Sequence, residues 1–491
     1  YSIEAPASFE RIQNYWLPYL RSLGINVPGI LVGNKIDLRS GNVTNKALED
    51  ELAPIMAEFK EVETCVECSA KLPLNVSEVF YFAQKAVLYP TAPLYDSRQH
   101  TLKHACIEAL KRIFKLCDMD KDGLLSNYEL NEFQRKCFDA PLQAQELGGI
   151  KDVVTQGAID LGWNPEASEA GPSGSHGASS SDGGASTLYG GNPHLRDDSL
   201  TLAGFLYLHT LFIRRGRLET TWTVLRTFGY GTDLTLLDAF VHPPFHIPLD
   251  CSVELSPHGY QFLTDIFEVH DQDRDGALSE EELTSLFSTA PGGKHPWQGT
   301  GFPQQTTITD ENGYVTLQGW LAQWSMTTLL DHMTTLAYMS YLGYPSFSTG
   351  GIHSGSGTPS SLRSPTDEYP PSRGSYMQGK RPNNGPLTPP PANPRKDKNA
   401  SPFPDVTSAL KLTNARRADR KKKGRIQRNV FLGLVFGAAG SGKTALLQAM
   451  IGKRFTHEYR PTAKTISAVS AVEHAGAEKY LVVSLLFCER Q

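Results

Sequence analysis

The sequence lacks the marks of membrane-spanning, secreted and nucleic-acid-binding chains. Among its 491 residues there is no run of about 18 or more apolar residues, the length that a helix needs to cross a bilayer. No secretory signal peptide is visible. The formal net charge is only −5, so bulk charge does not indicate a nucleic-acid partner. We therefore expect no transmembrane segment in these residues and no nucleic-acid ligand.

Cysteine is scarce as well, and its spacing argues against a disulfide framework. The seven cysteines are irregularly spaced, which is typical of a protein in a reducing compartment. Cys65 and Cys68 form a CxxC pattern, which a redox site or half of a zinc site would also show. No second such pair accompanies it, and the run is better explained as a strand.

Two segments of the chain repeat one acidic pattern. They are DMDKDGLLSNYE from Asp118 to Glu129 and DQDRDGALSEEE from Asp271 to Glu282. An EF-hand loop binds Ca²⁺ through oxygens at positions 1, 3, 5, 7, 9 and 12, and it needs glycine at position 6, where Gly123 and Gly276 stand. Both segments fill every position, so we predict two calcium sites. The ligands would be Asp118, Asp120, Asp122, the Leu124 carbonyl, Ser126 and Glu129 in the first loop and Asp271, Asp273, Asp275, the Ala277 carbonyl, Ser279 and Glu282 in the second.

Helices are predicted on both sides of each loop, because apolar residues recur there at helical spacing. Helix, acidic loop and helix in this order favour an EF-hand over an acidic surface turn, which is the alternative. The apolar positions are Ile107, Leu110, Phe114, Leu130, Phe133 and Cys137 around the first loop and Phe262, Ile266, Val269, Leu283, Leu286 and Phe287 around the second.

Each loop lies within a longer repeat. LTLAGF at 200–205 follows the first loop and VTLQGW at 315–320 follows the second, so the centre of the chain is a duplication. EF-hands work in pairs, in which each buries one face of the other's loop strand. We therefore expect the segments at 197–205 and 310–320 to be partner hands that bind no metal, because they lack the acidic ligands.

Two motifs near the start are typical of a guanine-binding site. NKID at 34–37 follows a predicted strand at 27–33, and SAK at 69–71 follows a strand within 59–68. The Asp37 carboxylate can accept both the ring N–H and the exocyclic amine of guanine, a pair that adenine does not offer. Asn34 would contact the base edge or tie the two loops together. The predicted base-site residues are Asn34, Lys35, Asp37, Ser69, Ala70 and Lys71.

A phosphate-binding loop is predicted near the other end. GAAGSGKT at 437–444 follows a strand at 430–436 and precedes a helix at 445–452. Its backbone N–H groups would point at phosphates, with Lys443 on the β and γ phosphates and the Thr444 hydroxyl on Mg²⁺. Thr462, in a segment placed like switch I, would meet Mg²⁺ and the γ-phosphate. The predicted phosphate-site residues are Gly437, Gly440, Ser441, Gly442, Lys443, Thr444 and Thr462.

Each nucleotide-binding segment shows only part of the usual motif set. Residues 1–90 contain no GxxxxGK[ST] and no DxxG, and no DxxG follows the strand predicted at 479–487. The residue that positions the attacking water belongs to switch II, so the catalytic residue stays unknown from this sequence. We therefore expect a chain that is truncated at both ends relative to complete GTPase domains.

The composition between the motifs predicts disorder in two places. Residues 164–193 are rich in Gly, Ser and Ala, and residues 345–424 are rich in Pro, Ser and Gly and then basic. Such segments bury too little apolar surface to offset the entropy of ordering. We read the basic run at 416–428 as a solvated lead-in to the next strand, with contact to an anionic membrane as an alternative.

The predicted fold class is multidomain α/β and α, with partial small-GTPase (P-loop NTPase) domains flanking a duplicated all-helical EF-hand region. The predicted parts are the C-terminal half of a first GTPase domain (1–92), EF-hand 1 with its partner hand (97–235), EF-hand 2 with its partner hand (236–344), a disordered then basic linker (345–424) and the N-terminal part of a second GTPase domain (425–491).

In this order the motifs resemble those of the mitochondrial Rho GTPases, or Miro family, of fungal type. The resemblance covers residues 1–344 and 425–483. It implies a GTP hydrolase regulated by calcium, with GTP or GDP, Mg²⁺ and two Ca²⁺ ions as ligands. It also implies a place on the cytosolic face of the outer mitochondrial membrane, where such proteins control mitochondrial morphology, transport or inheritance and contacts with the endoplasmic reticulum. Transport or tethering proteins would be the partners, and the membrane anchor that the family implies is absent from this sequence.

Two other functions stay open from the residues alone. The first is a calcium-responsive scaffold, in which the GTPase pieces are incomplete and inactive and the EF-hands bind partners. The second is a nucleotide kinase or an ATPase, which the P-loop alone would also fit.

Overall fold

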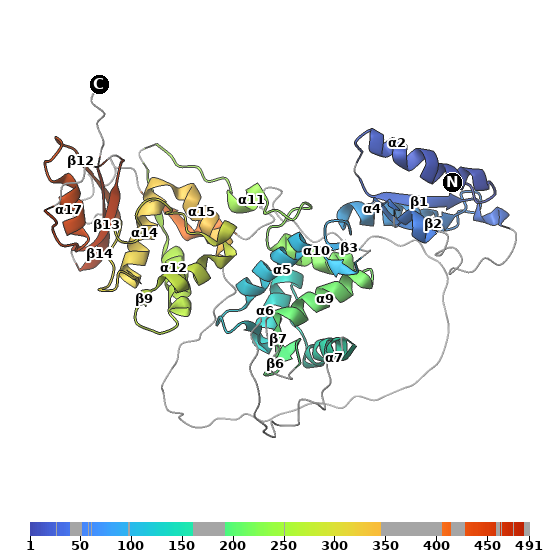
Figure 1. Cartoon of the computed structure of the whole chain (residues 1–491), viewed down its shortest axis with the longest axis horizontal. Coiled ribbons are helices and arrows are strands. Elements are labelled where there is room, and N and C mark those ends of the chain that lie inside the picture. The colour runs from blue at the N-terminus through green and yellow to red at the C-terminus, as the bar shows by residue number, and fades with distance from the viewer. Residues whose placement is uncertain are drawn as a thin grey trace, which may run out of the picture. The chain divides into compact units, whose positions relative to one another are not determined.

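The computed structural model describes most of the chain (Figure 1). The described residues are 1–25, 27–39, 52–56, 58–59, 61–96, 99–160, 192–249, 251–344, 405–413, 428–457, 462, 464–474 and 476–485. Nearly all of the insertion predicted at 164–193, most of the linker and the basic residues 416–427 lie outside them. Within the described residues, no helix combines the length and the apolarity that crossing a membrane requires.

The first part of the chain is a parallel strand pair with helices packed against it. β1 is a continuous apolar run, as expected of a buried parallel strand, and it pairs with β2 so that Asn34 lies opposite Cys68. Parallel strands end at the same edge of a sheet, so the residues that follow β1 and β2 lie side by side. The elements are α1 (Pro6–Arg11), the π-helical η1 (Ile12–Trp16), α2 (Leu17–Ser22), β1 (Gly29–Asn34), η2 (Ile36–Leu38), β2 (Val62–Cys68) and α4 (Val76–Leu88).

The first EF-hand unit, which we call the first hand unit, has a helical core with a small antiparallel sheet. α5 leads into the first acidic loop and α6 leaves it, and β5 of that loop pairs with β7, with Leu125 opposite Leu200. Trp222 and Phe205 are fully buried at the centre. The elements are β3 (Tyr95–Asp96), β4 (Thr101–Leu102), α5 (His104–Cys117), β5 (Leu124–Leu125), α6 (Asn127–Phe138), α7 (Ala144–Asp160), β6 (Leu195–Arg196), β7 (Ser199–Thr201), α9 (Leu202–Arg214) and α10 (Leu218–Thr227).

The second hand unit repeats this arrangement around the second acidic loop. β9 of that loop pairs with β10, with Leu278 opposite Val315. Trp297, Trp320 and Trp324 are buried in its core and their rings contact one another. The elements are α11 (Asp238–Val241), β8 (Val253–Leu255), α12 (Pro257–His270), β9 (Ala277–Leu278), α13 (Glu280–Leu286), η3 (Phe287–Thr289), η4 (Pro291–Gly293), β10 (Val315–Thr316), α14 (Leu317–Leu330) and α15 (His332–Tyr341).

Part of the predicted linker is ordered and belongs to the second hand unit. η5 (Val406–Ala409) and β11 (Leu410–Leu412) follow the linker, and β11 pairs antiparallel with β8. The prediction of disorder across 345–424 is therefore wrong for residues 405–413. The Pro, Ser and Gly content of the surrounding sequence hides this short apolar run, which the free edge of β8 and the core beside it hold in place. The region predicted as all-helical thus contains several short strands.

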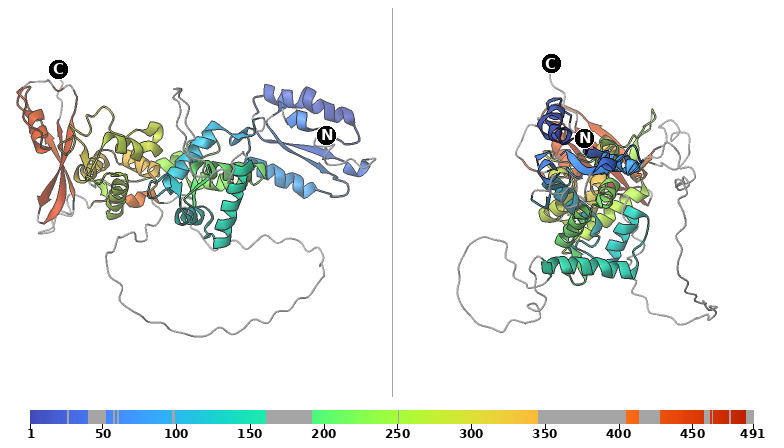
Figure 2. Two further views of the ribbon diagram at one scale, coloured as in Figure 1. Left: turned by 60° about the horizontal axis from the view of Figure 1, so that its bottom comes forward. Right: turned by 90° about the vertical axis from the view of Figure 1, so that its right-hand side faces the viewer.

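The last part of the chain is a sheet in the order β12-β14-β13. β12 runs parallel to β14, and β13 runs antiparallel to it; β13 has no counterpart among the predicted strands. α17 lies along one face of this sheet (Figure 2), where Leu447 and Ile451 pack on Ala468 and Leu485. The elements are β12 (Val430–Val435), α17 (Lys443–Met450), β13 (Ser467–His474) and β14 (Ala477–Leu485).

The other face of this sheet packs on the second hand unit. Ala322 and Met326 of α14 share a buried cluster with Val469 and Val482 of the sheet. The backbone N–H of Val469 donates to the carbonyl of Thr306 at 2.8 Å. The sheet that carries the strand leading to the predicted phosphate-binding loop is therefore packed between two helices, one of which belongs to the second hand unit.

Candidate functional site

The first acidic loop holds its carboxylates close together. One oxygen each from Asp118, Asp120 and Glu129 lie within 4.8 Å of one another. Backbone N–H groups point at them: Gly123 donates to Asp118 Oδ2 at 3.1 Å and Ser126 to Glu129 Oε2 at 2.8 Å. These donors offset the repulsion among the acidic groups. The loop is thus arranged for a cation with oxygen ligands, as Ca²⁺ prefers.

The second loop repeats this geometry. One oxygen each from Asp271, Asp273 and Asp275 lie within 4.8 Å of one another. Gly276 donates its N–H to Asp271 Oδ2 at 3.0 Å, and Gln272 donates to Glu282 Oε1 at 2.9 Å. The groups that lie closest together differ between the loops, since Glu129 joins the cluster in the first and Asp275 in the second.

Two predicted ligands also start the helix that leaves each loop. Ser126 caps α6 and Ser279 caps α13; each Oγ accepts from the backbone N–H of the glutamate at position 12. Glu129 and Glu282 accept in return from the serine N–H, which completes a capping box. Helix start and metal site therefore use the same side chains, so the serines at position 9 have a structural role besides the predicted one.

Both loops take a left-handed backbone at two positions. Gly123 and Gly276 have φ of +83°, as position 6 requires. Lys121 and Arg274, at position 4, also have positive φ, of 60° and 59°. Position 4 was not among the predicted functional positions, and its repetition in both loops is the signal that could have singled it out.

The two loops differ in burial at positions 1 and 12. Asp118 is 5% exposed and Glu129 is 4% exposed, whereas Asp271 and Glu282 are half-buried. Burial raises the pKa of Asp118 to about 6. At Glu282 burial acts in the same direction, but hydrogen bonds from Ser279 and Gln272 outweigh it and the pKa is lowered. The pKa of Asp118 and the pKa of Glu282 are thus displaced in opposite directions.

The guanine motifs meet at the ends of β1 and β2. Asn34 Oδ1 accepts from the N–H of Lys35 at 2.7 Å and from the N–H of Ala70 at 3.2 Å. The buried Ser69 donates its hydroxyl to Asp37 Oδ1 at 2.6 Å. Asn34 thus ties the two loops together, which was one of its two predicted roles, and Ser69 orients the aspartate.

The lysines of these two motifs are placed outside that network. Lys35 has φ of 68° and its Nζ lies 3.4 Å from Glu4 Oε2. Lys71, the last residue of SAK, lies in a turn. The structure therefore brings Asn34, Asp37, Ser69 and Ala70 into contact, while Lys35 pairs with an acidic residue.

The phosphate-binding loop has the strand–loop–helix setting that its motif requires. Gly440 and Gly442 have φ of +79° and +82°, and α17 begins directly after them at Lys443. Lys443 Nζ donates to the carbonyls of Gly437 at 2.9 Å and Ala438 at 2.7 Å. The hydroxyl oxygens of Thr444 and Thr462 lie 2.7 Å apart. The two predicted magnesium ligands thus converge, and their donor type suits Mg²⁺.

A fully buried carboxylate fixes the start of the strand that leads to this loop. Glu254 Oε1 accepts from the N–H groups of Asn429 at 2.9 Å and Val430 at 3.0 Å. Lys411 Nζ lies 3.5 Å from Glu254 Oε2. Nothing in the sequence predicts this role, because the partners are far apart in the chain.

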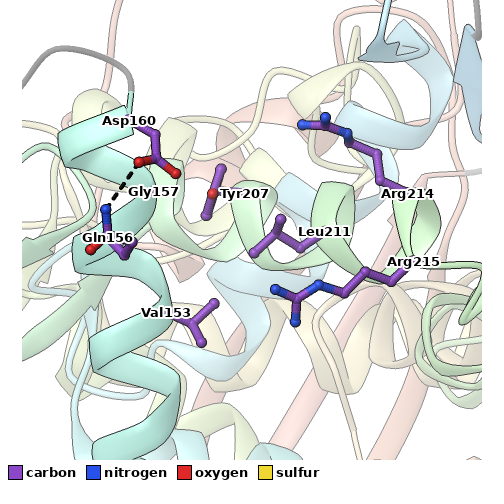
Figure 3. Close-up of a pocket in the computed structure, with 8 residues that line it drawn as sticks. All are labelled: Val153, Gln156, Gly157, Asp160, Tyr207, Leu211, Arg214 and Arg215. Atoms are coloured by element: carbon purple, nitrogen blue, oxygen red, sulfur yellow. Dashed lines mark hydrogen bonds between the residues drawn. The ribbon is translucent and has the colours of Figure 1, made fainter.

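A separate pocket of about 410 Å³ lies between α7 and α9 (Figure 3). Gln156 Nε2 donates to Asp160 Oδ1 along α7. None of the predicted site residues lines it. Its lining is Val153, Gln156, Gly157, Asp160, Tyr207, Leu211, Arg214 and Arg215.

The fold and these sites define a class: an EF-hand protein that also contains Ras-type α/β segments. A family model described as "Ras family" matches residues 1–89. Two models described as "EF hand associated" match residues 189–259 and 297–362, which include the segments predicted to be partner hands.

The similar proteins narrow this class. The chain is 68% identical over 485 residues to "Mitochondrial Rho GTPase 1" of Mycosarcoma maydis, which covers 98% of this chain and 60% of that protein. It is 53% identical over 495 residues to the protein of that name from Cryptococcus neoformans and 39% identical over 482 residues to the one from Gibberella zeae, again over 98% of this chain. The chain belongs to the mitochondrial Rho GTPase family, so the predicted resemblance is confirmed. It spans about 60% of the length of the first of these relatives.

Proposed function

We propose that this protein is a calcium- and GTP-regulated small GTPase of the outer mitochondrial membrane. In this role it controls mitochondrial morphology, transport or inheritance and contacts with the endoplasmic reticulum. Family membership supports the GTPase activity and the mitochondrial location. The observation that carries the calcium part is the convergence of carboxylates in two loops whose backbone N–H groups already hold them in place.

The residues of the phosphate-binding loop would act through charge and position. Lys443 now donates to two loop carbonyls, and it would transfer these hydrogen bonds to the phosphates of a bound nucleotide. The hydroxyls of Thr444 and Thr462 would hold Mg²⁺, which supplies positive charge beside the phosphates. Thr462 comes from the segment between α17 and β13, so binding at this site would hold Thr462 beside Thr444.

The base site would select guanine through Asp37. Its Oδ1 atom is oriented by Ser69, and Asn34 holds the two loops at a fixed separation. The pair of N–H donors on guanine would then find a carboxylate that is already placed. An Asp37→Ala variant should lose the preference for guanine over adenine nucleotides at this site.

Calcium titration of the full chain by calorimetry tests the calcium part. We expect two bound ions in the unchanged protein, one in Glu129→Gln, one in Glu282→Gln and none in the double variant, because the glutamate at position 12 supplies two oxygens. No heat of binding in the unchanged protein would contradict calcium regulation.

Fluorescent GTP and GDP analogues test the nucleotide part. Binding should depend on Mg²⁺ and should be lost in Lys443→Ala. Phosphate release from GTP, measured on the same samples, reports hydrolysis directly.

A calcium-responsive scaffold is the second candidate function. One observation favours it: both acidic loops bring their carboxylates together within the two hand units, and this arrangement uses no residue of either α/β segment. Two bound calcium ions without any binding or hydrolysis of GTP would support the scaffold over the GTPase.

A further inference from the structure

One arginine of the first hand unit donates three hydrogen bonds to backbone carbonyls of the second hand unit. Arg112 lies on α5, and its Nε donates to the carbonyl of Thr289 at 2.9 Å. Its Nη2 donates to the carbonyls of Ser340 at 3.1 Å and Tyr341 at 3.0 Å. The ring centre of Tyr230 lies 5.8 Å from the guanidinium carbon.

These acceptors suit a positive charge. Thr289 ends η3, and Ser340 and Tyr341 end α15, where the carbonyls of a helix carry partial negative charge. The Arg112 Nη1 atom has no exposure to solvent, and burial lowers the pKa of Arg112 while the nearby Tyr230 opposes that change. A buried cation is costly without such partners, so these three carbonyls define where α5 can lie against η3 and α15.

Arg112 lies close in the chain to the first acidic loop, and one of its acceptors lies close to the second. α5 ends at Cys117, directly before the first calcium ligand, Asp118. η3 follows α13, the helix that leaves the second loop. Arg112 therefore joins the helix that enters the first loop to the segment that leaves the second. Close packing supports this junction, since a Cβ added to Gly343 would lie 3.0 Å from Leu116 of α5.

We propose that Arg112 couples the two calcium loops, so that an ion in one loop changes the affinity of the other. The inference rests on the proposed function, which has both loops binding calcium. If α13 moves when the second loop binds an ion, Thr289 at the end of η3 would move with it. The hydrogen bond from Arg112 to Thr289 would pass this movement to α5, and Asp118 follows directly after α5. Coupling between two binding sites is reciprocal, so each ion must change the affinity of the other site by the same factor.

Calorimetric titration of the full chain measures that factor. The affinity of each loop is obtained alone, from Glu129→Gln and Glu282→Gln, and together, from the unchanged protein. We expect the two loops to change each other's affinity by about fivefold or more, the lower end of known couplings. The same three titrations, repeated with Arg112→Gln added to each protein, should give a coupling factor of about 1. The shorter Gln side chain cannot reach the three carbonyls.

Two further variants separate coupling from general damage. Arg135→Gln is the matched control: its exposed side chain lies on α6 of the same hand, 3.5 Å from Glu132, and the coupling factor should be unchanged. Arg112→Lys keeps the charge with fewer donors and should retain part of the factor. If Arg112→Gln no longer binds two ions, Arg112→Lys takes its place in the comparison with the unchanged protein.

The outcomes are distinct. Two bound ions with a factor of about 1 in the unchanged protein would overturn the coupling and leave the proposed calcium regulation intact. The same factor in Arg112→Gln as in the unchanged protein would overturn the role of Arg112. No bound calcium at all would sink the coupling together with the proposed calcium regulation. Hydrogen exchange gives a second readout: calcium added to Glu282→Gln should alter exchange in residues 332–343, and no change there would overturn the inference.

Discussion

The two calcium loops share their ligands but differ in the basic side chain at position 4. Lys121 of the first loop is half-buried, and its Nζ donates to the carbonyls of Lys115 and Asp118. Burial lowers the pKa of Lys121, and the charge of Asp118 opposes this change. Arg274 of the second loop is exposed. A fixed positive charge beside the first ligand disfavours a divalent cation, so the first loop should bind Ca²⁺ more weakly than the second.

Replacing that lysine should therefore tighten the first site. We expect Lys121→Gln, in the Glu282→Gln background, to raise the calcium affinity of the first loop by roughly fivefold. This corresponds to about 1 kcal/mol, the repulsion expected between one positive charge and a divalent cation that are separated by water. Calorimetry measures it, with Arg274→Gln in the Glu129→Gln background as the matched change. An equal effect at both loops, or none at the first, would contradict this account of Lys121.

A buried histidine makes the first hand unit sensitive to acid. His209 is 2% exposed, and its Nδ1 lies 3.1 Å from Thr221 Oγ1. Burial lowers the pKa of His209 from 6.5 to about 3. Between these values the unfolded chain binds one more proton than the folded chain. The free energy of unfolding should therefore fall as the pH falls below 6.5, by roughly 1.4 kcal/mol per pH unit from this group.

Urea unfolding at a series of pH values, followed by tryptophan fluorescence in calcium-free buffer, measures this slope. His209→Gln should lose the part of the slope that His209 contributes, whatever its effect at pH 7. His104→Gln, at a side chain that is 89% exposed, should keep the full slope. An unchanged slope in His209→Gln would mean that other groups cause the acid sensitivity.

At the scale of elements, η5 and β11 show how a segment distant in sequence completes a hand. The backbone of Ala409 crosses α12 so closely that a Cβ added to Gly259 would lie 2.3 Å from the Ala409 carbonyl oxygen. The N–H of Ser256 donates to that same carbonyl at 2.8 Å. Gly259 is therefore the residue that lets residues 405–413 approach the start of α12.

Gly259→Ala should destabilise the second hand unit by about 2–4 kcal/mol, in the range of a buried steric clash. Gly148→Ala is the control with the opposite sign. It lies on α7 with nothing within 4 Å of an added Cβ, so the alanine should stabilise the protein by up to about 1 kcal/mol. Urea unfolding followed by tryptophan fluorescence measures both. Equal, small effects would show that η5 can move away from α12 at little cost.

Local patterns predicted the elements and ligands that depend on neighbouring residues. All six ligands of each calcium loop stand in one contiguous segment, and the capping serines stand in it too. The meeting of Asn34 and Ala70 followed from a general rule about the edges of parallel strands. By contrast, the bond from Arg112 to Thr289 joins residues 177 apart, and β11 finds its partner β8 across the linker. Contacts between residues so far apart produce no local sequence pattern, so only the structure reveals them.

At the scale of the whole molecule, the second hand unit and the phosphate-binding segment share a core. Glu254 stands at this junction: it lies on β8, directly before α12, the helix that enters the second calcium loop. It also accepts the N–H groups that begin β12, the strand that leads to the phosphate-binding loop. One buried carboxylate thus connects the unit that carries the second acidic loop with the segment that carries the predicted phosphate-binding loop, by accepting main-chain N–H groups.

Removing that carboxylate should loosen β12. Glu254→Ala leaves the N–H groups of Asn429 and Val430 without their acceptor and Lys411 without its ion-pair partner. Each buried donor that is left unsatisfied costs about 1–3 kcal/mol. We expect faster hydrogen exchange at residues 429–435 in this variant. In the unchanged protein, calcium should slow exchange in the same residues, because it stabilises the unit that holds Glu254. Glu473→Ala, at an exposed position of β13, should leave both results unchanged. If calcium protects β12 equally in Glu254→Ala, the connection runs through the packing of α14 on the sheet instead of through this carboxylate.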